Sequence, residues 1–385
     1  MTIRLAVPTI EEDDIQAVVD VLRSGFLVQG PKIKAFEDEF AKYVGTEHCV
    51  AVTNCTCALY MMLLELGIGA GDKVAVCTYS WPATANAIRM VGADPVFVEI
   101  EGETFNMDPD ALEATLKKHR ASAGESGARI KAVMPVHTFG GSADIERIVK
   151  VAGDIPVIED AACALGTAQN GKRAGTFGVA GCFSLHPRKA ITTGEGGMVT
   201  TNDASIARKI RMLRSHGQDP DAAKPDFVGF GHNLRMTDFQ GAMGLSQMKK
   251  LERIILARVT VAKRYDALLE GAAGNGIRPP RSLPNTRHVY QSYVTLLPKD
   301  LIGKRDLVVL AMKRRDIETT LGTYHMPLIR SFREWGKFAP GDFPVTDDVA
   351  ARALSLPIYE HLTADLQATV ISALKESVAE VLAAS

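Results

Sequence analysis

Short apolar runs alternate with amphipathic stretches between residues 49 and 159. The apolar runs have the length and composition of strands, and the stretches between them have the period of helices. This alternation predicts a mostly parallel β-sheet covered by helices on both faces, with a small polar loop at 121–128. The expected strands are residues 49–53, 73–77, 95–99, 130–136 and 155–159, and the expected helices between them are residues 56–66, 82–91, 108–119 and 143–152.

The pattern changes after residue 203, where long helix-like stretches dominate. A chain of 385 residues is long enough for two domains. We therefore expect a large α/β domain over residues 1–260 and a smaller α+β domain over residues 261–385, with a linker rich in Gly, Pro and Asn at 271–285. The expected elements in this part are helices 204–215, 238–269, 305–313, 350–354 and 364–381, and a strand at 288–297.

Composition and charge exclude several classes of protein. The net charge is −1, which predicts no general attraction to nucleic acid or to a membrane surface. No apolar run approaches the roughly 18 residues of a membrane helix, and the N-terminus does not resemble a signal peptide. The six cysteines lie in the first half without the spacing of zinc ligands, so we expect reduced thiols, no metal and a cytoplasmic protein.

One lysine stands at a place where lysines do chemistry. Lys189 follows the strand-like run that begins at Cys182, and it precedes the tight turn Thr193–Gly197. A lysine held at a rigid junction can form a Schiff base with a carbonyl compound. Since a lone lysine is more often a solvated surface charge, the interpretation depends on which groups accompany it.

Two strand-to-helix turns could bind a cofactor. Asn54–Ala58 opens a helix, and its free N–H groups suit a phosphate, although Asn54 or Thr56 could simply cap the helix. Trp81 precedes a helix that begins with proline, and its indole could stack on an aromatic ring or belong to the core.

Three further side chains follow apolar strands. Asp160 could cap a turn or hold a protonated ring nitrogen, as an acid does beside a pyridoxal ring. The Ser184 hydroxyl could add a hydrogen bond to a phosphate, whereas His186 more often has a structural role in such a turn. The carboxyl ends of strands are where an α/β sheet contacts its ligands. Together with Lys189, these groups predict a phosphate cradle, a stacking ring, an acid and an imine-forming lysine.

The order of these motifs resembles pyridoxal-phosphate enzymes of the aspartate-aminotransferase fold, and more closely the DegT/DnrJ/EryC1/StrS family of sugar aminotransferases. The resemblance spans nearly the full chain. It implies fold type I: a mostly parallel seven-stranded sheet flanked by helices, with a smaller C-terminal α+β domain. The matching segments are Ser24–Pro31, Glu159–Ala162, Ser184–Lys189, Thr193–Gly197, Asn233–Asp238 and Leu354–Tyr359.

The resemblance also implies a role for each site residue. Lys189 forms the imine with the cofactor, Asp160 pairs with the pyridine nitrogen and Trp81 stacks on the ring. The phosphate is bound by Thr56 and Cys57, assisted by Ser184 and by Asn233 of the neighbouring subunit of a homodimer with shared active sites. His325 and Tyr324 belong to the segment that borders the sugar, and these two residues and His186 are the expected substrate contacts.

Two positions depart from the family pattern. Cys55 stands where the phosphate loop usually begins with glycine. Cys163 stands where the family usually has a Gln or His that touches the phenolic oxygen of the cofactor, and a thiol is a weaker hydrogen-bonding group.

The resemblance implies an aminotransferase that uses pyridoxal 5'-phosphate, with pyridoxamine 5'-phosphate as the intermediate form. Its substrate is expected to be a nucleotide-linked sugar with a ketone at C3 or C4, and its amino donor glutamate or glutamine. One alternative is a sugar dehydratase of the same family, in which histidine replaces the lysine. Another is an aminotransferase for a carbohydrate without a nucleotide, such as a keto-inositol. A pyridoxal-binding regulator would need a DNA-reading module, which the sequence does not indicate.

Overall fold

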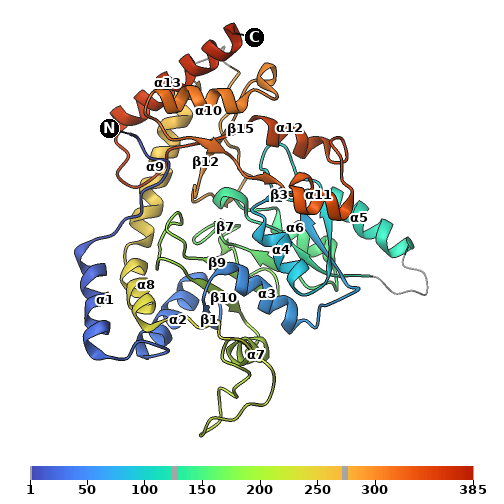
Figure 1. Ribbon diagram of the computed structural model, residues 1–385, viewed down its shortest axis with the longest axis vertical. Coiled ribbons are helices and arrows are strands. Elements are labelled where there is room, and N and C mark those ends of the chain that lie inside the picture. The colour runs from blue at the N-terminus through green and yellow to red at the C-terminus, as the bar shows by residue number, and fades with distance from the viewer. Residues whose placement is uncertain (1, 123–128, 271–275, 385) are drawn as a thin grey trace.

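A β-sheet lies at the centre of the larger part of the molecule (Figure 1). The computed structural model describes residues 2–122, 129–270 and 276–384. Most of the predicted polar loop at 121–128 and residues 271–275 of the predicted linker lie outside this description. The strands of the central sheet are β1 (His48–Val52), β2 (Lys73–Cys77), β4 (Asp94–Val98), β5 (Ile130–Met134), β6 (Ile158–Asp160), β9 (Ala180–Ser184) and β10 (Gly197–Thr201).

Hydrogen bonds group these strands into a four-stranded sheet, β1-β10-β9-β6, and a three-stranded sheet, β4-β2-β5. Two isolated parallel bridges, Val133–Val157 and Val136–Asp160, join the edge at β5 to the edge at β6. The seven strands therefore run in the order β1-β10-β9-β6-β5-β2-β4. Of these described strands, β10 is antiparallel to both of its neighbours and the others are parallel to one another. A mostly parallel sheet was expected from the alternating pattern.

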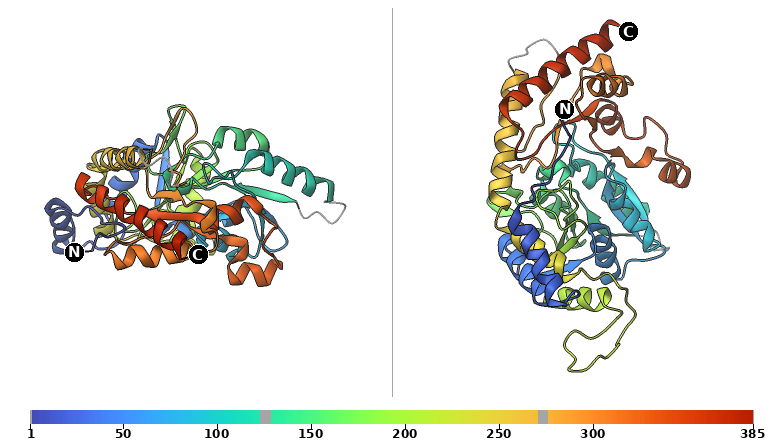
Figure 2. Two further views of the ribbon diagram at one scale, coloured as in Figure 1. Left: turned by 90° about the horizontal axis from the view of Figure 1, so that it is seen from above. Right: turned by 60° about the vertical axis from the view of Figure 1, so that its left-hand side comes forward.

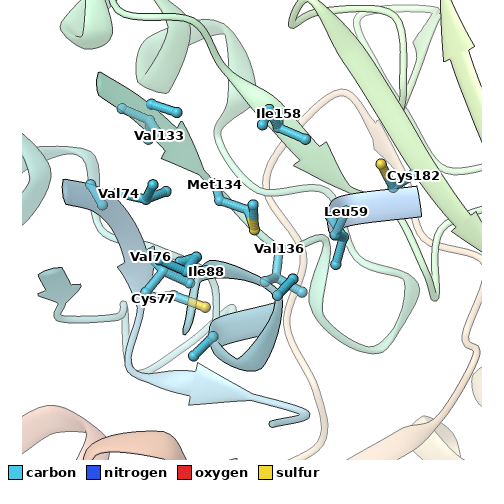
Figure 3. Packing of buried hydrophobic residues seen from close by; sticks show 14 of the residues in the cluster. Leu59, Val74, Val76, Cys77, Ile88, Val133, Met134, Val136, Ile158 and Cys182 are labelled. Atoms are coloured by element: carbon cyan, nitrogen blue, oxygen red, sulfur yellow. The ribbon is translucent and has the colours of Figure 1, made fainter. Parts of the chain in front are cut away.

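Both faces of this sheet are buried, as β1 illustrates. Its side chains alternate between faces: Val50 and Val52 belong to one hydrophobic core, whereas Cys49 and Ala51 belong to a second core. Figure 3 shows part of the first core, where side chains of several strands pack together with those of neighbouring helices. The first core is covered by α3 (Cys55–Glu65), α4 (Ala83–Met90), α5 (Pro109–Ser122), α6 (Ile145–Ala152) and α7 (Ala204–Arg214), and the second by α2 (Pro31–Val44), α8 (Asp238–Met248) and α9 (Leu251–Glu270).

The prediction of one long helix at 238–269 is wrong, because this stretch forms two helices. The chain leaves α8 after Met248 and enters α9 at Leu251. Between them lies the buried Lys250, whose Nζ bonds to Asp14 Oδ2 at 2.8 Å. Asp14 belongs to α1 (Glu12–Ser24), which packs along α8. This contact joins residues more than 200 positions apart, which a local pattern does not reveal.

The C-terminal part has its own sheet and its own buried cluster. The sheet has the order β12-β15-β13, and the helices α10 and α13 pack beside it. The cluster draws on the second half of α9 and on residues further along the chain, together with Ile3. A domain boundary near residue 260 would fall inside α9, and the proposed division at 260/261 stays a prediction. The bounds are β12 (Tyr293–Leu296), β13 (Thr320–Leu321), β15 (Ala353–Leu356), α10 (Arg305–Arg314) and α13 (Ala364–Ala383).

Two predictions in this part need correction. The strand expected at 288–297 is regular only over Tyr293–Leu296, because Tyr290 has a positive φ of 47° and the preceding segment is irregular. The helix expected at 350–354 ends at Arg352, and Ala353 begins β15, where it pairs with Leu296. A short apolar run is compatible with either structure, and here the neighbouring strand decides.

Several short elements connect the two parts. The antiparallel pair β3–β14 brings the segment after β2 against the C-terminal part. The long helix α9 runs from the central sheet toward the end where both termini lie (Figures 1 and 2).

None of the helices in the described ranges is long and apolar enough to cross a membrane. The remaining bounds are β3 (Tyr79–Ser80), β7 (Ala168–Gln169), β8 (Lys172–Arg173), β11 (Thr286–Arg287), β14 (Tyr324–His325), α11 (Arg330–Gly336) and α12 (Pro344–Arg352).

Candidate active site

Lys189 lies on the loop that joins β9 to β10. The two strands pair with Ser184 opposite Gly197, so the loop between them is held at both ends. Within the loop, the Lys189 N–H donates to the carbonyl oxygen of His186 at 2.8 Å. The Thr193 N–H bonds to the Leu185 carbonyl at 3.1 Å, which closes the loop at its base. The predicted rigid junction around the lysine is therefore present.

The amine of Lys189 points to Cys163. Its Nζ lies 3.0 Å from Cys163 Sγ, and both residues line a small cavity together with Ser184 and Gln291. Burial works against the charged amine, but the nearby Cys163 and, more weakly, Asp160 outweigh this effect and raise the pKa of Lys189. Lys189 is accordingly a half-buried group in a defined pocket, and the solvated surface charge that was the alternative is excluded.

Asp160 ends β6 and is 4% exposed. Its Oδ2 accepts a hydrogen bond from Thr84 Oγ1 at 2.7 Å, and its Oδ1 accepts one from the Ala162 N–H at 3.1 Å. Burial raises the pKa of the Asp160 carboxyl, although these hydrogen bonds and the charge of Lys189 partly oppose the shift. A buried acid with fixed oxygens is suited to hold a proton on a ring nitrogen.

The strand that presents Asp160 is anchored by the preceding residue. Glu159 is fully buried, and its carboxylate accepts hydrogen bonds from the N–H groups of Gly175, Phe177 and Gly178 at 2.7–2.8 Å. It also accepts one from His137 Nε2 at 2.9 Å. These bonds fix the end of β6 against the loop before β9. Sequence reasoning assigned no role to Glu159, although a carboxylate inside an apolar strand is a signal of such an anchor.

The N-terminus of α3 faces the same edge of the sheet. Asn54 caps the helix, because its Oδ1 accepts a hydrogen bond from the Cys57 N–H at 2.9 Å. Asn54 therefore caps the helix, as one of the two interpretations of this turn expected, and the N–H of Cys57 is already hydrogen-bonded to the cap. The amides of Cys55 and Thr56 belong to the first turn and have no intrahelical acceptor. They, the Thr56 hydroxyl and the Cys57 thiol remain for a phosphate.

Strand β10 lies against the start of α3, where Cys55 stands in place of the usual glycine. Cys55 is buried, and the backbone of β10 passes directly over the start of α3. A Cβ on Gly197 would lie 2.4 Å from the carbonyl carbon of Asn54 and 2.7 Å from Cys55 N. The residue without a side chain at this contact is thus Gly197, which lets strand and helix approach closely.

Trp81 lies between β3 and α4 and is 62% exposed, so it is not a core residue. Its ring contacts the ring of Tyr324 edge to face, with 5.4 Å between centroids. Tyr324 belongs to β14, which pairs with β3 so that Tyr324 lies opposite Ser80. The predicted ring platform and the predicted sugar-bordering segment therefore meet.

His325 points away from this meeting place. It is buried, and its Nε2 lies 3.1 Å from Asp347 Oδ1 on α12, while its ring packs on Phe343. Burial lowers the pKa of His325 against the opposing charge of Asp347. Because the His325 ring is engaged by Asp347 and Phe343, these contacts do not support its expected contact with the substrate, which stays a prediction.

The remaining predicted residues lie at different distances from the lysine loop. Ser184 ends β9 and lines the cavity with Lys189. His186 is half-buried, its Nδ1 accepts the Arg188 N–H at 3.2 Å, and burial lowers its pKa. Asn233 is exposed on the segment between α7 and α8, which extends from the body of the molecule (Figures 1 and 2). An exposed place suits the predicted contact with a second subunit.

The residues present fit pyridoxal phosphate. Lys189 Nζ lies 3.0 Å from Cys163 Sγ, and α3 packs against both β6 and β9. Burial raises the pKa of the Cys55 thiol, the charge of Asp160 adds to this shift and the charge of Lys189 opposes it, so the acid, the amine and the helix N-terminus converge. The free first-turn amides provide for an anionic group, the buried carboxyl for a ring nitrogen and the amine for an aldehyde. Thr84, which sequence reasoning missed, holds the carboxyl in place.

With the strand order and the lysine loop established, the class of protein is clear: the chain is an α/β enzyme of the aspartate-aminotransferase fold. More specifically, it belongs to the DegT/DnrJ/EryC1/StrS aminotransferase family, whose model matches residues 8–375. The predicted family and fold class are confirmed.

Named relatives span nearly the whole chain. GDP-perosamine synthase from Caulobacter vibrioides is 35% identical over 378 residues, which cover 97% of this chain and 98% of the relative. The spore coat polysaccharide biosynthesis protein SpsC from Bacillus subtilis is 35% identical over 386 residues, covering 97% and 96%. Among solved structures, Spr1654 from Streptococcus pneumoniae, described as a candidate sugar aminotransferase, superposes in its PMP-form with a TM-score of 0.91 at 27% identity, covering 100% of this chain and 99% of that one. Its PLP-form superposes with a TM-score of 0.90.

Proposed function

We propose that this protein transfers an amino group from glutamate or glutamine to a nucleotide-linked keto-sugar with the ketone at C3 or C4. The observation that carries the proposal is the convergence of Lys189, Asp160 and the N-terminus of α3 at one edge of the sheet. The aminotransferase activity and the pyridoxal phosphate cofactor follow from the family and its PLP-form and PMP-form structures. The name of GDP-perosamine synthase supports a nucleotide-linked sugar as the substrate.

Each group has a distinct task. The cofactor, when bound, supplies the electron sink that makes the α-proton of an amine removable. Lys189 would hold the carbonyl carbon of the cofactor, and its amine would serve as the general base and acid that moves a proton at the amine carbon of the donor. The carboxyl of Asp160 would keep the ring nitrogen protonated. The first turn of α3 would hold the phosphate, and Trp81 would cover a face of the ring.

The presence of Lys189 argues against the dehydratase alternative. A residue that removes and returns a proton at the amine carbon is needed for transamination, and this chain has a lysine in the loop where that group must stand. A keto-inositol in place of a nucleotide-linked sugar stays an alternative substrate. Incubation with L-glutamate and a panel of both kinds of ketone distinguishes the three, by whether an aminated or a deoxygenated product appears.

The decisive experiment is chemical capture of the cofactor. We expect borohydride reduction of the purified protein with pyridoxal phosphate to label Lys189, as mapped by peptide mass. Lys189→Ala is expected to lose both the label and turnover, whereas Lys34→Ala, at an exposed lysine on α2, retains both. A label on another amine of the wild-type protein would refute the assignment.

A homodimer with shared active sites and a cytoplasmic location complete the proposal. Several large apolar side chains are exposed on two segments, which supports a contact with another subunit. These side chains are Phe26, Leu27, Val28, Phe227, Val228 and Phe230.

A further inference from the structure

The peptide unit that leads into Lys189 is held from both sides. Its N–H, on Lys189, donates to the His186 carbonyl within the same loop at 2.8 Å. Its C=O, on Arg188, accepts a hydrogen bond from Gln291 Nε2 at 2.7 Å. Gln291 comes from a segment about 100 residues further along the chain, just before β12, and it is only 9% exposed. The direction in which Lys189 leaves the backbone therefore depends on a side chain from outside the loop.

The segment that carries Gln291 has an irregular backbone. Tyr290 adopts a positive φ of 47°, a conformation that costs free energy in a residue with a large side chain. His288 Nδ1 accepts the Tyr290 N–H at 2.8 Å, and the two rings stack with 4.0 Å between centroids. Burial lowers the pKa of His288 to about 3, so this nitrogen stays an acceptor at neutral pH.

The same segment lies tightly against the loop after β5. The Val289 N–H bonds to the Gly140 carbonyl at 3.0 Å. A Cβ on Gly140, whose φ is +90°, would lie 2.9 Å from Gln291 N and 3.0 Å from the Cys163 carbonyl oxygen. Gln291 thus lies between Gly140 and the cavity of Lys189, and its backbone has no room to shift toward Gly140.

A buried arginine supports the segment from α9. Arg258 Nη1 donates to the carbonyls of Gln291 at 3.2 Å and Tyr290 at 3.4 Å. No carboxylate among the residues that the structure describes forms a salt bridge with Arg258, and its Nε has no hydrogen-bond partner there. Burial lowers the pKa of Arg258 to about 10, so the guanidinium is still charged at neutral pH. Because the buried guanidinium donates to these two backbone carbonyls, it stabilises the irregular backbone at Tyr290 and Gln291.

We propose that Gln291 is a positioning residue for Lys189: its side-chain amide fixes the carbonyl of Arg188 and thereby aims the reactive amine. The inference rests on the proposed role of Lys189. It adds that the segment leading into the C-terminal sheet, supported by Arg258, sets how fast Lys189 reacts by holding the backbone of its loop.

The test compares two substitutions at one position. Gln291→Leu keeps much of the volume but cannot donate a hydrogen bond. Gln291→Glu is isosteric and donates only when its carboxyl is protonated. Gln367→Leu is the matched control, since Gln367 is also buried and its Nε2 also donates to a backbone carbonyl, that of Val261 at 2.9 Å, in the C-terminal cluster.

The measurement is stopped-flow absorbance during covalent capture of pyridoxal phosphate by the apoprotein. Its concentration dependence separates the initial affinity from the limiting rate. We expect Gln291→Leu to lower the limiting rate about 10- to 100-fold, the usual size of a loss of alignment, with the initial affinity within about twofold. For Gln291→Glu, the rate relative to wild type is expected to rise as the pH falls, because the protonated acid restores the donor.

Three results would overturn the proposal. The first is a limiting rate for Gln291→Leu equal to that of wild type or of Gln367→Leu. The second is a Gln291→Glu rate that stays at a constant fraction of wild type across pH, which would show loss of packing only; this arm decides the question if the leucine variant does not fold. The third is a wild-type protein that captures no cofactor, which would remove the proposed function as well.

Discussion

At the scale of single residues, Asp160 is a proposed catalytic group whose burial affects the stability of the fold. Its carboxyl is 4% exposed, and burial raises its pKa above the usual value of about 3.9. When a buried acid titrates at higher pH in the folded than in the unfolded chain, its ionisation destabilises the fold. The penalty is absent below the unfolded pKa, develops as the pH rises toward the folded pKa and is complete above it.

We therefore expect Asp160→Asn to stabilise the apoprotein at neutral pH by on the order of 1 kcal/mol, and to lose this advantage as the pH falls to about 4. The amide can still accept from the Ala162 N–H and can donate to Thr84. Urea unfolding at several pH values measures the gain. The same variant should transaminate about 100-fold more slowly, as when a charge-stabilising group is removed. A stability difference that does not change with pH would contradict this account.

The sequence shows some site residues and hides others for a physical reason. Asp160 and Lys189 follow apolar runs whose length indicates strands, so their place at the edge of a sheet could be predicted. The contacts of Gln291 with Arg188 and of Thr84 with Asp160 join residues that are 103 and 76 positions apart. Such partners become visible only when the fold brings the segments together.

At the scale of elements, the close approach of β10 to the start of α3 places the predicted phosphate site. Gly197→Ala would put a methyl group 2.4 Å from the carbonyl carbon of Asn54, so strand and helix must separate. We expect a loss of about 1–3 kcal/mol in unfolding free energy and a weaker affinity for pyridoxal phosphate. Gly69→Ala is the control, because its Cβ would meet nothing closer than 3.7 Å. Equal affinities for the two variants, measured by fluorescence titration, would contradict the expectation.

Elements were predicted well where one local signal decides them and poorly where the environment decides. The strands β2 and β5 lie within the predicted ranges because their runs are mostly apolar and belong to a sheet buried on both faces. The division of the helix at Lys250 and the change from helix to strand at Ala353 depend on partners distant in the chain. No local period contains that information.

At the scale of the whole molecule, the exposed segment after α7 matters most. Phe230 on this segment is 99% exposed, which is unusual for a phenylalanine unless a partner covers it. In the proposed homodimer, Asn233 of one chain binds the phosphate held by the other. Asn233→Asp would then place a carboxylate beside that phosphate and block the site of the partner, not its own.

Subunit mixing tests this arrangement. Lys189→Ala and Asn233→Asp homodimers are each expected to be nearly inactive. After exchange of subunits, half of the dimers are mixed and each has one intact site, so roughly a quarter of wild-type activity should return. The activity of the mixture before exchange is the control. If activity after exchange does not exceed that of the parents, Asn233 acts within its own chain.

The pairing of β3 with β14 holds the strand before Trp81, the proposed platform for the cofactor ring, against the segment expected to border the sugar. Engineering a new sugar preference by grafting residues 322–327 from a relative would thus also disturb Trp81, whose ring meets Tyr324. A graft that also replaces Tyr79–Trp81 would transfer both contacting segments together and so preserve the contact between them. The preference for the sugar substrate and the absorption spectrum of bound pyridoxal phosphate should then change together.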